Sequence, residues 1–321
     1  MSESVTIKVP ARLHLGFLDI PRSGQDRFGS VGLPIQDIET VLTISRATDI
    51  HIHGEEQARI AQHIATLCAH LGIKTPHRVS VQRAIPRHIG LGSGTQIAIA
   101  VAAGLRTLHA LPLDTAQDAV LLGRGSRSGI GIAAFEEGGV IVDAGKGFGQ
   151  QAPTVISRIP FPEAWRIILV LDTATQGMHG EAEIEAFRTL PPFPAATSAL
   201  ICRHVLMSIM PALVEQDLAS FGRAVEAIQT EIGTYFSPAQ GGVFTSRLVE
   251  ATLHRLVKAG AVGIGQSSWG PTGFAFAASQ ADAERIVGEI GGRSPGTAIQ
   301  IVAGRNAGAE ITHTALNLAR A

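Results

Sequence analysis

The feature that most constrains the fold of this chain is a glycine-rich loop between a strand-like segment and an alanine-rich segment. Residues 78–82 alternate like a strand, residues 85–96 have the sequence IPRHIGLGSGTQ, and residues 97–108 are rich in alanine. Glycine at positions 90, 92 and 94 leaves the inside of the turn free of side chains. Small residues in the next segment allow a helix to pack closely on a sheet. The sequence therefore predicts a strand–loop–helix unit within a layered fold.

Hydrophobic periodicity predicts similar layers along the rest of the chain. In the first half it predicts an amphipathic helix at residues 55–71 and strands at residues 5–9, 40–45, 78–82, 139–142 and 166–171. In the second half it predicts strands at residues 261–266, 273–277 and 298–302, and helices at residues 180–190, 195–216, 218–235, 245–259 and 282–290. The alternation of strands and helices indicates an α+β sandwich with helices on one face.

The length of 321 residues suggests two domains. Residues 150–162 carry three prolines and little periodicity, which places the boundary near residue 160 and gives domains 1–160 and 161–321. Hydrophobic residues make up 45% of the chain and charged residues 17%, so apolar material is ample and the composition is not that of a disordered protein.

Charge and cysteine content exclude several classes of protein. Lys and Arg number 26 and Asp and Glu 27, a balance that argues against a nucleic-acid partner. Cys68 and Cys202 are the two cysteines, which excludes a disulfide framework and a cysteine-rich zinc site. Because the N-terminus lacks a signal-peptide pattern and no apolar run approaches ~20 residues, we expect a cytoplasmic protein that does not bind membranes.

The glycine loop has the chemistry of an anion site. Its backbone N–H groups can point to one centre, and Ser93 and Thr95 add hydroxyls where a helix begins. Residues 83–127 contain five arginines against two aspartates. No lysine follows the last glycine, so the loop is not a Walker loop, and it lacks the GxGxxG spacing. The alternative is an ordinary glycine turn in which Ser93 only caps the helix.

Three segments in order resemble the motifs of the GHMP kinase superfamily. The loop, through Pro86, Gly90, Leu91, Gly92 and Ser93, is similar to the motif that wraps nucleotide phosphates. Residues 10–19 (PARLHLGFLD) and 260–276 (GAVGIGQSSWGPTGFAF) are similar to the first and third motifs. Small-molecule kinases of this superfamily often carry S-G-x-D seven residues before a glycine pair. This chain has Gly131 at the aspartate position, followed by Gly138 and Gly139, so it lacks the carboxylate that would activate an alcohol.

The pattern as a whole resembles a non-kinase branch, the family of beta-ribofuranosylaminobenzene 5'-phosphate synthases of tetrahydromethanopterin biosynthesis. RLHLGFLD, HIGLGSGTQ, GRGSRSGIG, FEEGGVIVDAG and VGIGQSSWGPTGFAF carry the resemblance between residues 12 and 276. It implies that phosphoribosyl pyrophosphate and 4-aminobenzoate or 4-hydroxybenzoate give a C-riboside phosphate, carbon dioxide and pyrophosphate. It also implies a two-domain α+β GHMP-kinase-like fold, a mixed N-terminal sheet with a left-handed βαβ crossover, a ferredoxin-like C-terminal domain and a homodimer.

That reaction would explain the absent base. If the ring carbon that bears the carboxylate attacks ribose C1, the ring regains aromaticity by losing carbon dioxide rather than a proton. The site then has to stabilise the departing pyrophosphate and hold the arene near C1. We expect a phosphate cradle of Gly90, Gly92, Ser93, Gly94, Thr95 and Gln96, with Arg124 and Arg127 as further anion partners. The alternative for both arginines is a solvated position at a helix end.

A second donor cluster, Gln266, Ser267 and Ser268, is expected to bind the ribose 5-phosphate or the loop, unless it is a simple polar turn. In the first motif, Arg12 and His14 alternate and would share one face of a strand. We expect Arg12 to pair with a phosphate or with the benzoate carboxylate.

The other candidate residues each keep two interpretations. His14 polarises the ring substituent or is structural, and Asp19 holds a magnesium ion or caps a turn. Asp143 ends an apolar strand, where a carboxylate can reach a metal, and Trp269 stacks on the arene or fills the core. Any metal is expected to be Mg²⁺ that arrives with the pyrophosphate substrate, without a need for ATP.

Two other functions compete with the synthase. One is an ATP-dependent GHMP kinase that uses another carboxylate, such as Asp19, as its base. The other is a non-catalytic protein that binds a phosphorylated metabolite. Gly131 argues against the kinase, and the preservation of all the motif segments argues against loss of catalysis.

Overall fold

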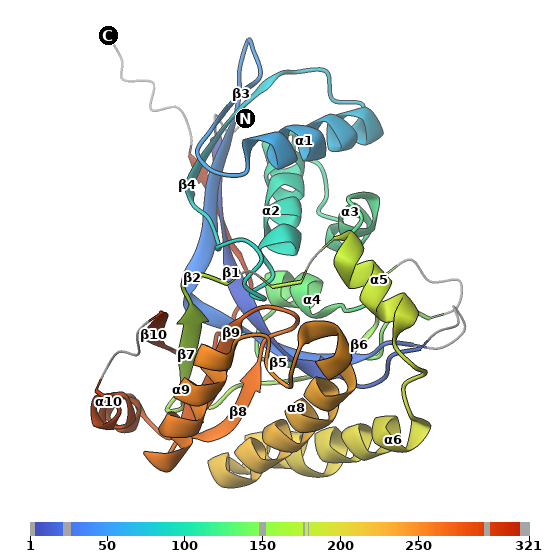
Figure 1. Cartoon of the computed structure of the whole chain (residues 1–321). Helices are drawn as coiled ribbons and strands as arrows, with labels where there is room; N and C mark the ends of the chain where they lie inside the picture. The colour runs from blue at the N-terminus through green and yellow to red at the C-terminus, as the bar shows by residue number, and fades with distance from the viewer. Residues whose placement is uncertain are drawn as a thin grey trace.

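A computed structural model describes residues 4–21, 27–147, 152–175, 177–178, 180–291 and 296–314 (Figure 1). Within these residues the strands form two sheets. The first sheet contains seven strands: β1 (Ser4–Phe17), β2 (Ser30–Arg46), β3 (His51–His53), β4 (His77–Arg83), β5 (Val140–Asp143), β6 (Val155–Ile159) and β11 (Glu310–Thr314). The second contains four: β7 (Arg166–Asp172), β8 (Val262–Gln266), β9 (Thr272–Ala277) and β10 (Thr297–Val302).

The first sheet is built around the long antiparallel pair β1 and β2. Strand β11 pairs with the outer edge of β1, and β4 pairs with one half of β2. Strand β3 lies parallel to β4 and is connected to it through helix α1, while β5 and β6 extend the sheet from the other half of β2. Mixed pairing of this kind confirms the expected mixed sheet.

Helices cover one face of this sheet: α1 (Gln57–Leu71), α2 (Ser93–Leu108), α3 (Thr115–Leu121) and α4 (Ile130–Glu136) (Figure 1). Helix α2 lies in the middle of this layer and contacts both β1 and β2. At Gly104 of α2 a Cβ atom would lie 2.7 Å from the side chains of Ile7 and Ile44. The absence of a side chain there lets the helix approach the sheet closely, as its small residues predict.

The second sheet is antiparallel, with the strand order β10-β7-β9-β8. Numbered along the chain from β7, this is the order 4-1-3-2 of a ferredoxin-like domain, which confirms that expectation. Helices α9 (Arg247–Lys258) and α10 (Gln280–Glu289) cover one face and share a core with it. The other face contributes Ile167, Leu169 and Phe274 to a core that also contains Leu13 and Leu15 of β1. The two domains are therefore joined by one continuous hydrophobic core.

The remaining helices lie beside that shared core: α5 (Glu181–Thr189), α6 (Ala195–His204), η1 (Val205–Ile209), α7 (Met210–Glu215) and α8 (Leu218–Gln240). Helix α8 contacts β1 and β8, so it touches both sheets. One continuous helical stretch, Ala195–Glu215, is long and apolar enough by composition to span a membrane. Its inward residues Ile201, Val205 and Ile209 belong to the shared core, whereas Leu206, Met207 and Val214 are exposed.

Several strands differ from the sequence-based expectations. Strands β1 and β2 run well beyond residues 5–9 and 40–45, although each contains a proline, Pro10 and Pro34. Pro10 lies at a register shift in the β1–β2 pair, where a missing N–H is tolerated. Strands β6 and β11 were not expected, because short or edge strands carry weak alternation.

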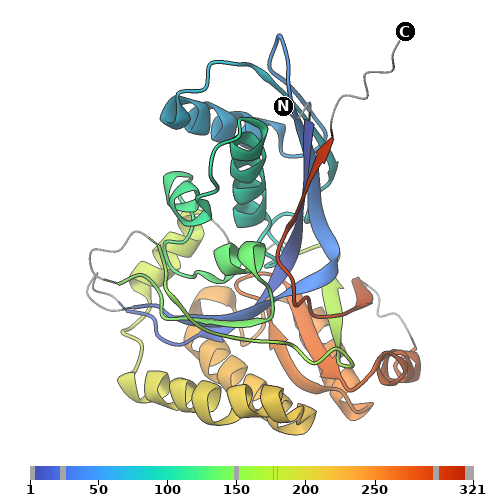
Figure 2. The same ribbon diagram turned by 180° about the vertical axis from the view of Figure 1, so that it is seen from behind.

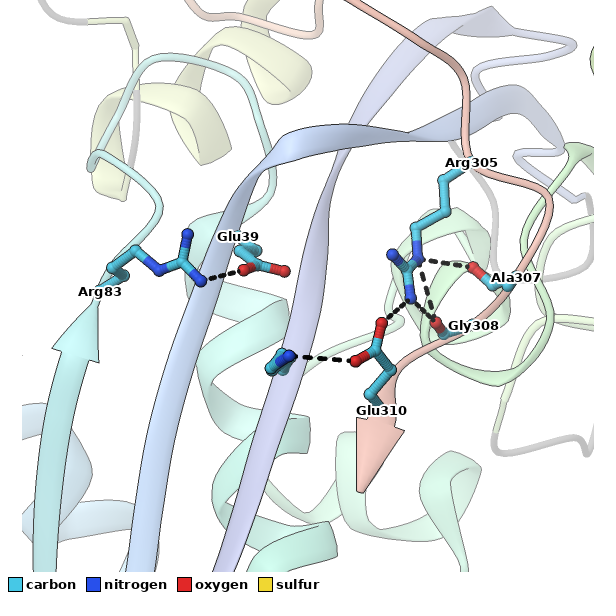
Figure 3. A network of polar contacts seen from close by, with 7 residues as sticks. Glu39, Arg83, Arg305, Ala307, Gly308 and Glu310 are labelled. Carbon is cyan, nitrogen blue, oxygen red and sulfur yellow. Dashed lines mark hydrogen bonds and ion pairs between the residues drawn. The ribbon is translucent and has the colours of Figure 1, made fainter. Parts of the chain in front are cut away.

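Strand β11 brings the end of the described chain back to the first sheet, beside β1 (Figure 2). The chain passes from the first sheet to the second between Ile159 and Arg166 and returns to the first sheet at β11. A surface network accompanies the return: Glu310 accepts hydrogen bonds from Lys8 at 3.2 Å and from Arg305 at 2.9 Å, and Arg305 also donates to the carbonyls of Ala307 and Gly308 (Figure 3).

Candidate active site

The glycine loop ends where α2 begins, at Ser93. Gly90 and Gly92 have φ angles of 88° and 84°, in the left-handed region that favours glycine. A Cβ on Gly90 would lie 2.1 Å from the carbonyl oxygen of Ser267, and one on Gly270 would lie 2.1 Å from the carbonyl carbon of Ile89. The loop and the β8–β9 turn therefore touch backbone to backbone, and a larger residue at either glycine would separate them.

Side chains of the first and third motifs fasten this contact. The carbonyl oxygen of Gly90 accepts hydrogen bonds from the Arg12 guanidinium and, at 2.8 Å, from the Ser267 hydroxyl. Ser267 Oγ in turn accepts the backbone N–H of His14 at 3.0 Å. Three segments that are far apart in the sequence thus form one hydrogen-bonded unit at the domain junction.

Three adjoining hollows surround this unit. The outer cleft is lined by loop residues Gly90, Gly92, Ser93, Gly94 and Thr95 and by Arg12, Arg59, His88, Arg124, Gly180, Glu183 and Ser268. The middle cleft is lined by Arg12, His14, Phe17, Thr95, Gly123–Ser128, Gly131, Glu183 and Ser268. The inner cavity is lined by His14, Gly16, Phe17, Gln229, Ile232, Gly233, Phe236, Gln240, Val243, Gln266, Ser268 and Trp269.

Ser268 lines all three hollows and marks their junction. Its φ of 58° is left-handed, a strained conformation for a residue with a side chain. Arg12 lines the outer and middle clefts, whereas His14 and Phe17 line the middle cleft and the inner cavity. The three hollows therefore adjoin one another between the glycine loop and the aromatic wall, with these side chains at their borders.

The outer and middle clefts are strongly cationic. Among the described residues that line them are four arginines, Arg12, Arg59, Arg124 and Arg127, against one carboxylate, Glu183. Arg127 forms an ion pair with Glu183 and lies 4.2 Å from the centroid of the Phe187 ring. These contacts attach α5 to the rim of the clefts, and the excess of guanidinium groups suits a substrate with several phosphate charges.

Arg124 is held where it can meet an anion. Its guanidinium would lie 3.2 Å from a Cβ on Gly94, so it packs against the first turn of α2. Its Nε is buried and has no hydrogen-bond partner among the described residues. Burial lowers the pKa of Arg124, and nearby Arg59 lowers it further. The negative charge of a bound phosphate would oppose both effects.

The inner cavity has an aromatic, largely apolar wall and a volume of about 30 Å³. The rings of Phe236 and Trp269 lie 4.2 Å apart between centroids, and those of His14 and Phe17 lie 4.6 Å apart. Two buried polar atoms at this wall, His14 Nε2 and Trp269 Nε1, have no hydrogen-bond partner among the described residues. A buried polar atom without a hydrogen-bond partner lowers the stability of the protein unless a ligand supplies the partner.

The protonation states at the junction follow from burial. Burial, with the neighbouring Arg12 charge, lowers the pKa of His14 to about 3, so its imidazole is neutral at physiological pH. Burial also lowers the pKa of Arg12 to about 10, and the charge of Glu183 opposes that shift. Arg12 therefore remains a cation beside a neutral histidine.

Gly131, at the position where kinases carry the aspartate, faces the first turn of α2. A Cβ there would lie 2.9 Å from Cγ2 of Thr95. The Gln96 amide donates to the Gly131 carbonyl at 2.9 Å. Thr95 and Gln96 thus occupy the space beside Gly131, and a carboxylate would not fit without displacing them.

Some of the expected site residues line the clefts, whereas the side chains of others form contacts within the protein beside the clefts. Gly90, Gly92, Ser93, Gly94, Thr95, Arg12, Arg124, Arg127 and Ser268 line the clefts, His14 lines the middle cleft and the inner cavity, and Trp269 lines the inner cavity. Gln96 is turned into the α2–α4 contact. Ser267 is fully buried in the unit described above. Gln266 lines the inner cavity, but its amide is engaged with Thr245, Gln240 and Ser268.

Asp19 and Asp143 have local partners. Asp19 accepts the backbone N–H of Ile20 at 2.7 Å and lines none of the three hollows. Asp143 is fully buried and accepts hydrogen bonds from the Ser30 hydroxyl and from the backbone N–H groups of Gly129 and Gly145. It holds the turn that starts α4.

Arg59, His88 and Glu183 also line the clefts, although none of them was expected as a site residue. Arg59 lies on α1 and Glu183 on α5, both outside the three motifs. Their place at the clefts depends on how helices from two domains pack. A basic residue at the start of α1 was the one available signal, and surface helices show the same feature.

The described residues contain no group of three or more His, Cys, Asp or Glu side chains that could hold a metal ion. One carboxylate, that of Glu183, lines the cationic clefts. Such a site fits a cation that takes most of its ligands from substrate phosphates and water, as Mg²⁺ does, rather than one held by protein alone.

The sequence matches the family models of the GHMP kinases N terminal domain, over residues 45–139, and of GHMP kinases C terminal, over residues 209–293. It is 31% identical to the beta-ribofuranosylphenol 5'-phosphate synthase of Methanothermobacter thermautotrophicus, covering 94% of this chain and 97% of that protein. It is 33% identical to the beta-ribofuranosylphenol 5'-phosphate synthase of Archaeoglobus fulgidus, covering 86% and 88%.

Solved structures with a similar fold include kinases and a decarboxylase. Homoserine kinase from Cytophaga hutchinsonii superposes with a TM-score of 0.70 at 16% identity, covering 97% of this chain and 98% of that one. Mevalonate diphosphate decarboxylase from Staphylococcus aureus superposes with a TM-score of 0.69 at 15% identity, covering 98% and 99%. These likenesses confirm the two-domain α+β fold.

Proposed function

The chain belongs to the beta-ribofuranosylphenol 5'-phosphate synthase family, within the GHMP kinase superfamily, and from this premise we propose how it works as an enzyme. It joins phosphoribosyl pyrophosphate to 4-hydroxybenzoate and yields a beta-ribofuranosylphenol 5'-phosphate, carbon dioxide and pyrophosphate. The observation that carries the proposal is that arginine-lined clefts adjoin an aromatic cavity, with glycine where a kinase base would stand.

The bonds balance without a proton acceptor. A bond forms between the carboxylate-bearing ring carbon and ribose C1, and the bond from C1 to the diphosphate oxygen breaks, its electrons leaving with pyrophosphate. The ring then loses carbon dioxide, and the electrons of that bond restore aromaticity. The beta product of an alpha-configured donor requires the arene and the leaving group to lie on opposite sides of C1.

The order of the three hollows suits that displacement. The diphosphate fits the outer cleft, where the backbone N–H groups and hydroxyls at the start of α2 and the arginines can stabilise its developing charge. The ribose then lies in the middle cleft and the arene in the inner cavity, on the side away from the loop. Arg127, which is paired with Glu183, and Ser128 line the middle cleft where the 5-phosphate would lie.

We propose that Mg²⁺ would enter with the diphosphate and that Glu183, the carboxylate among the described cleft-lining residues, would help to hold it. When bound, the ion neutralises part of the diphosphate charge. We further propose that the enzyme acts in the cytoplasm as a homodimer, in tetrahydromethanopterin biosynthesis, on small-molecule substrates.

An ATP-dependent kinase is the weaker candidate. Gly131 supplies no carboxylate, Thr95 fills the adjoining space, and Asp19 lies outside the clefts. No observation on the described residues favours the non-catalytic alternative over an enzyme.

The proposal is tested by trapping labelled carbon dioxide from carboxyl-labelled 4-hydroxybenzoate in the presence of phosphoribosyl pyrophosphate and Mg²⁺. We expect release that requires both substrates and is unaffected by ATP. Release of ADP from ATP and a small alcohol, with no labelled carbon dioxide, would support the kinase and exclude the synthase.

A further inference from the structure

The polar side chains that line the inner cavity differ in whether they have hydrogen-bond partners. The side-chain amides of Gln229, Gln240 and Gln266 line this cavity, but they already form hydrogen bonds with backbone groups and with one another. His14 Nε2 and Trp269 Nε1 are buried without a partner among the described residues, and each side chain is only 4% exposed. These two atoms are therefore left to meet a polar group on a ligand, together with the hydroxyl of Ser268, which lines this cavity and both clefts.

Their positions along the cavity differ. His14 lines both the middle cleft and the inner cavity, so it stands at the mouth, whereas Trp269 lines the inner cavity alone. An arene that presents its carboxylate-bearing carbon to the ribose must place that end at the mouth. Its para substituent then points inward, toward Trp269.

The indole N–H of tryptophan can only donate a hydrogen bond. A phenol oxygen accepts such a bond readily, because it keeps a lone pair outside the ring. An aniline nitrogen accepts it poorly, because its lone pair is delocalised into the ring, and its own N–H groups face a donor. With an aminobenzoate the buried indole N–H would stay unsatisfied, which is costly.

We infer that Trp269 is the residue that distinguishes a para-hydroxyl from a para-amino group, through a hydrogen bond from its Nε1–H to the substrate oxygen. This inference rests on the proposed function, since it concerns the arene of the same reaction. The ring of Phe236, 4.2 Å from that of Trp269 between centroids, holds the indole in place. Because the pKa of His14 is about 3, its imidazole is neutral and adds no positive charge to that of Arg12 at the mouth of the cavity.

A binding experiment tests the location without depending on turnover. The chain has two tryptophans, and Trp165 lies in the core against Phe161 and Phe221, away from the inner cavity. In a Trp165→Phe variant the fluorescence comes from Trp269. Saturable quenching by 4-hydroxybenzoate is expected, and unchanged emission at saturating ligand, with activity intact, would overturn the inference.

A kinetic experiment tests the specificity. In Trp269→Phe we expect kcat/KM for 4-hydroxybenzoate to fall by about tenfold, mostly through KM, the cost of one net hydrogen bond. For 4-aminobenzoate we expect kcat/KM to change by less than about threefold. The ratio of the kcat/KM values for 4-hydroxybenzoate and 4-aminobenzoate should therefore fall. Trp165→Phe, which also trims a buried indole, should leave the ratio of the two substrates unchanged.

Equal losses for both substrates in Trp269→Phe would mean that the indole only fills space. If the parent enzyme releases no carbon dioxide from either benzoate, the proposed reaction fails instead. Quenching of Trp269 by 4-hydroxybenzoate in that case would still place an arene site in the inner cavity.

Discussion

Among single residues, Arg124 shows most directly how burial prepares a side chain for an anion. Its guanidinium packs on Gly94 at the start of α2, and its Nε lacks a partner among the described residues. From the sequence, Arg124 was expected near the loop only because residues 83–127 contain more arginines than acidic residues. It could not distinguish a cleft residue from a solvated one, because the contact with Gly94 depends on the tertiary fold.

Enlarging Gly94 should disturb this arrangement. A Cβ at Gly94 would meet Arg124 at 3.2 Å, so Gly94→Val is expected to push the guanidinium aside and narrow the outer cleft. We expect KM for phosphoribosyl pyrophosphate to rise by about 10- to 100-fold, the loss of one or two charge-assisted hydrogen bonds. Gly288→Val in α10 lies far from the clefts and provides the control. Steady-state kinetics with an unchanged KM in Gly94→Val would refute the placement of the diphosphate.

Replacing the guanidinium itself gives a complementary prediction. Arg124→Met keeps much of the apolar stem but removes the charge, and should raise the same KM by about tenfold or more. Arg83→Met removes an arginine that pairs with Glu39 on the sheet surface and should leave KM unchanged. Equal effects of the two substitutions would indicate a general charge effect rather than a binding site.

His14 makes folding stability depend on pH. Its pKa is about 3 in the folded protein, against about 6.5 when exposed in the unfolded chain. Between those values the unfolded chain binds one more proton, so stability falls as pH falls below about 6.5. This histidine alone should cost about 2 kcal/mol between pH 7 and pH 5.

Chemical denaturation at both pH values measures this effect. The stability difference between pH 7 and pH 5 should shrink by that amount in His14→Gln and stay the same in His51→Gln, which alters an exposed histidine of β3. A pH dependence that is unchanged by His14→Gln would show that the imidazole is not held neutral.

At the scale of elements, the site depends on contacts between backbone segments that only glycine permits. The glycine clusters in the sequence indicated close approach but did not say to what. The structure shows that Gly90 and Gly270 bring two distant motifs into contact, and that Gly131 brings α4 against α2. The strand–loop–helix unit was predictable from local pattern, whereas the contact between Gly90 and Ser267 joins residues 177 positions apart.

The contact between the loop and the β8–β9 turn should be intolerant of a methyl group. Gly270→Ala would place a Cβ 2.1 Å from the backbone of Ile89. We expect a loss of about 2–3 kcal/mol of unfolding free energy. Gly288→Ala, in open space within α10, should be neutral or stabilise by up to about 1 kcal/mol. Equal stability of the two variants would contradict the backbone contact.

The packing of Thr95 on Gly131 can be measured as a coupling. Gly131→Ala adds a methyl group 2.9 Å from Cγ2 of Thr95, and Thr95→Ser removes that Cγ2. The double variant should therefore be more stable than the sum of the single effects by about 1 kcal/mol. Additive effects in thermal unfolding would mean that Thr95 does not occupy the place of the kinase carboxylate.

On the scale of the whole molecule, an enzyme architecture shared with ATP-dependent kinases is combined with an aromatic cavity at the domain junction. The ferredoxin-like order of the second sheet and the mixed first sheet followed from the resemblance of the motifs, because periodicity cannot reveal strand order. The inner cavity was not predictable. Its walls come from β1, α8 and the β8–β9 turn, whose meeting depends on the shared core.

The central claim is that departure of the carboxylate replaces a catalytic base, and it is tested most directly by comparing 4-hydroxybenzoate with phenol as acceptors. Phenol has the same ring, but its reacting carbon would have to lose a proton. With phosphoribosyl pyrophosphate and Mg²⁺, 4-hydroxybenzoate should give equal amounts of carbon dioxide and pyrophosphate, and phenol should give no pyrophosphate above background. Formation of the same riboside phosphate from phenol at a comparable rate would mean that the site contains a base, contrary to the claim.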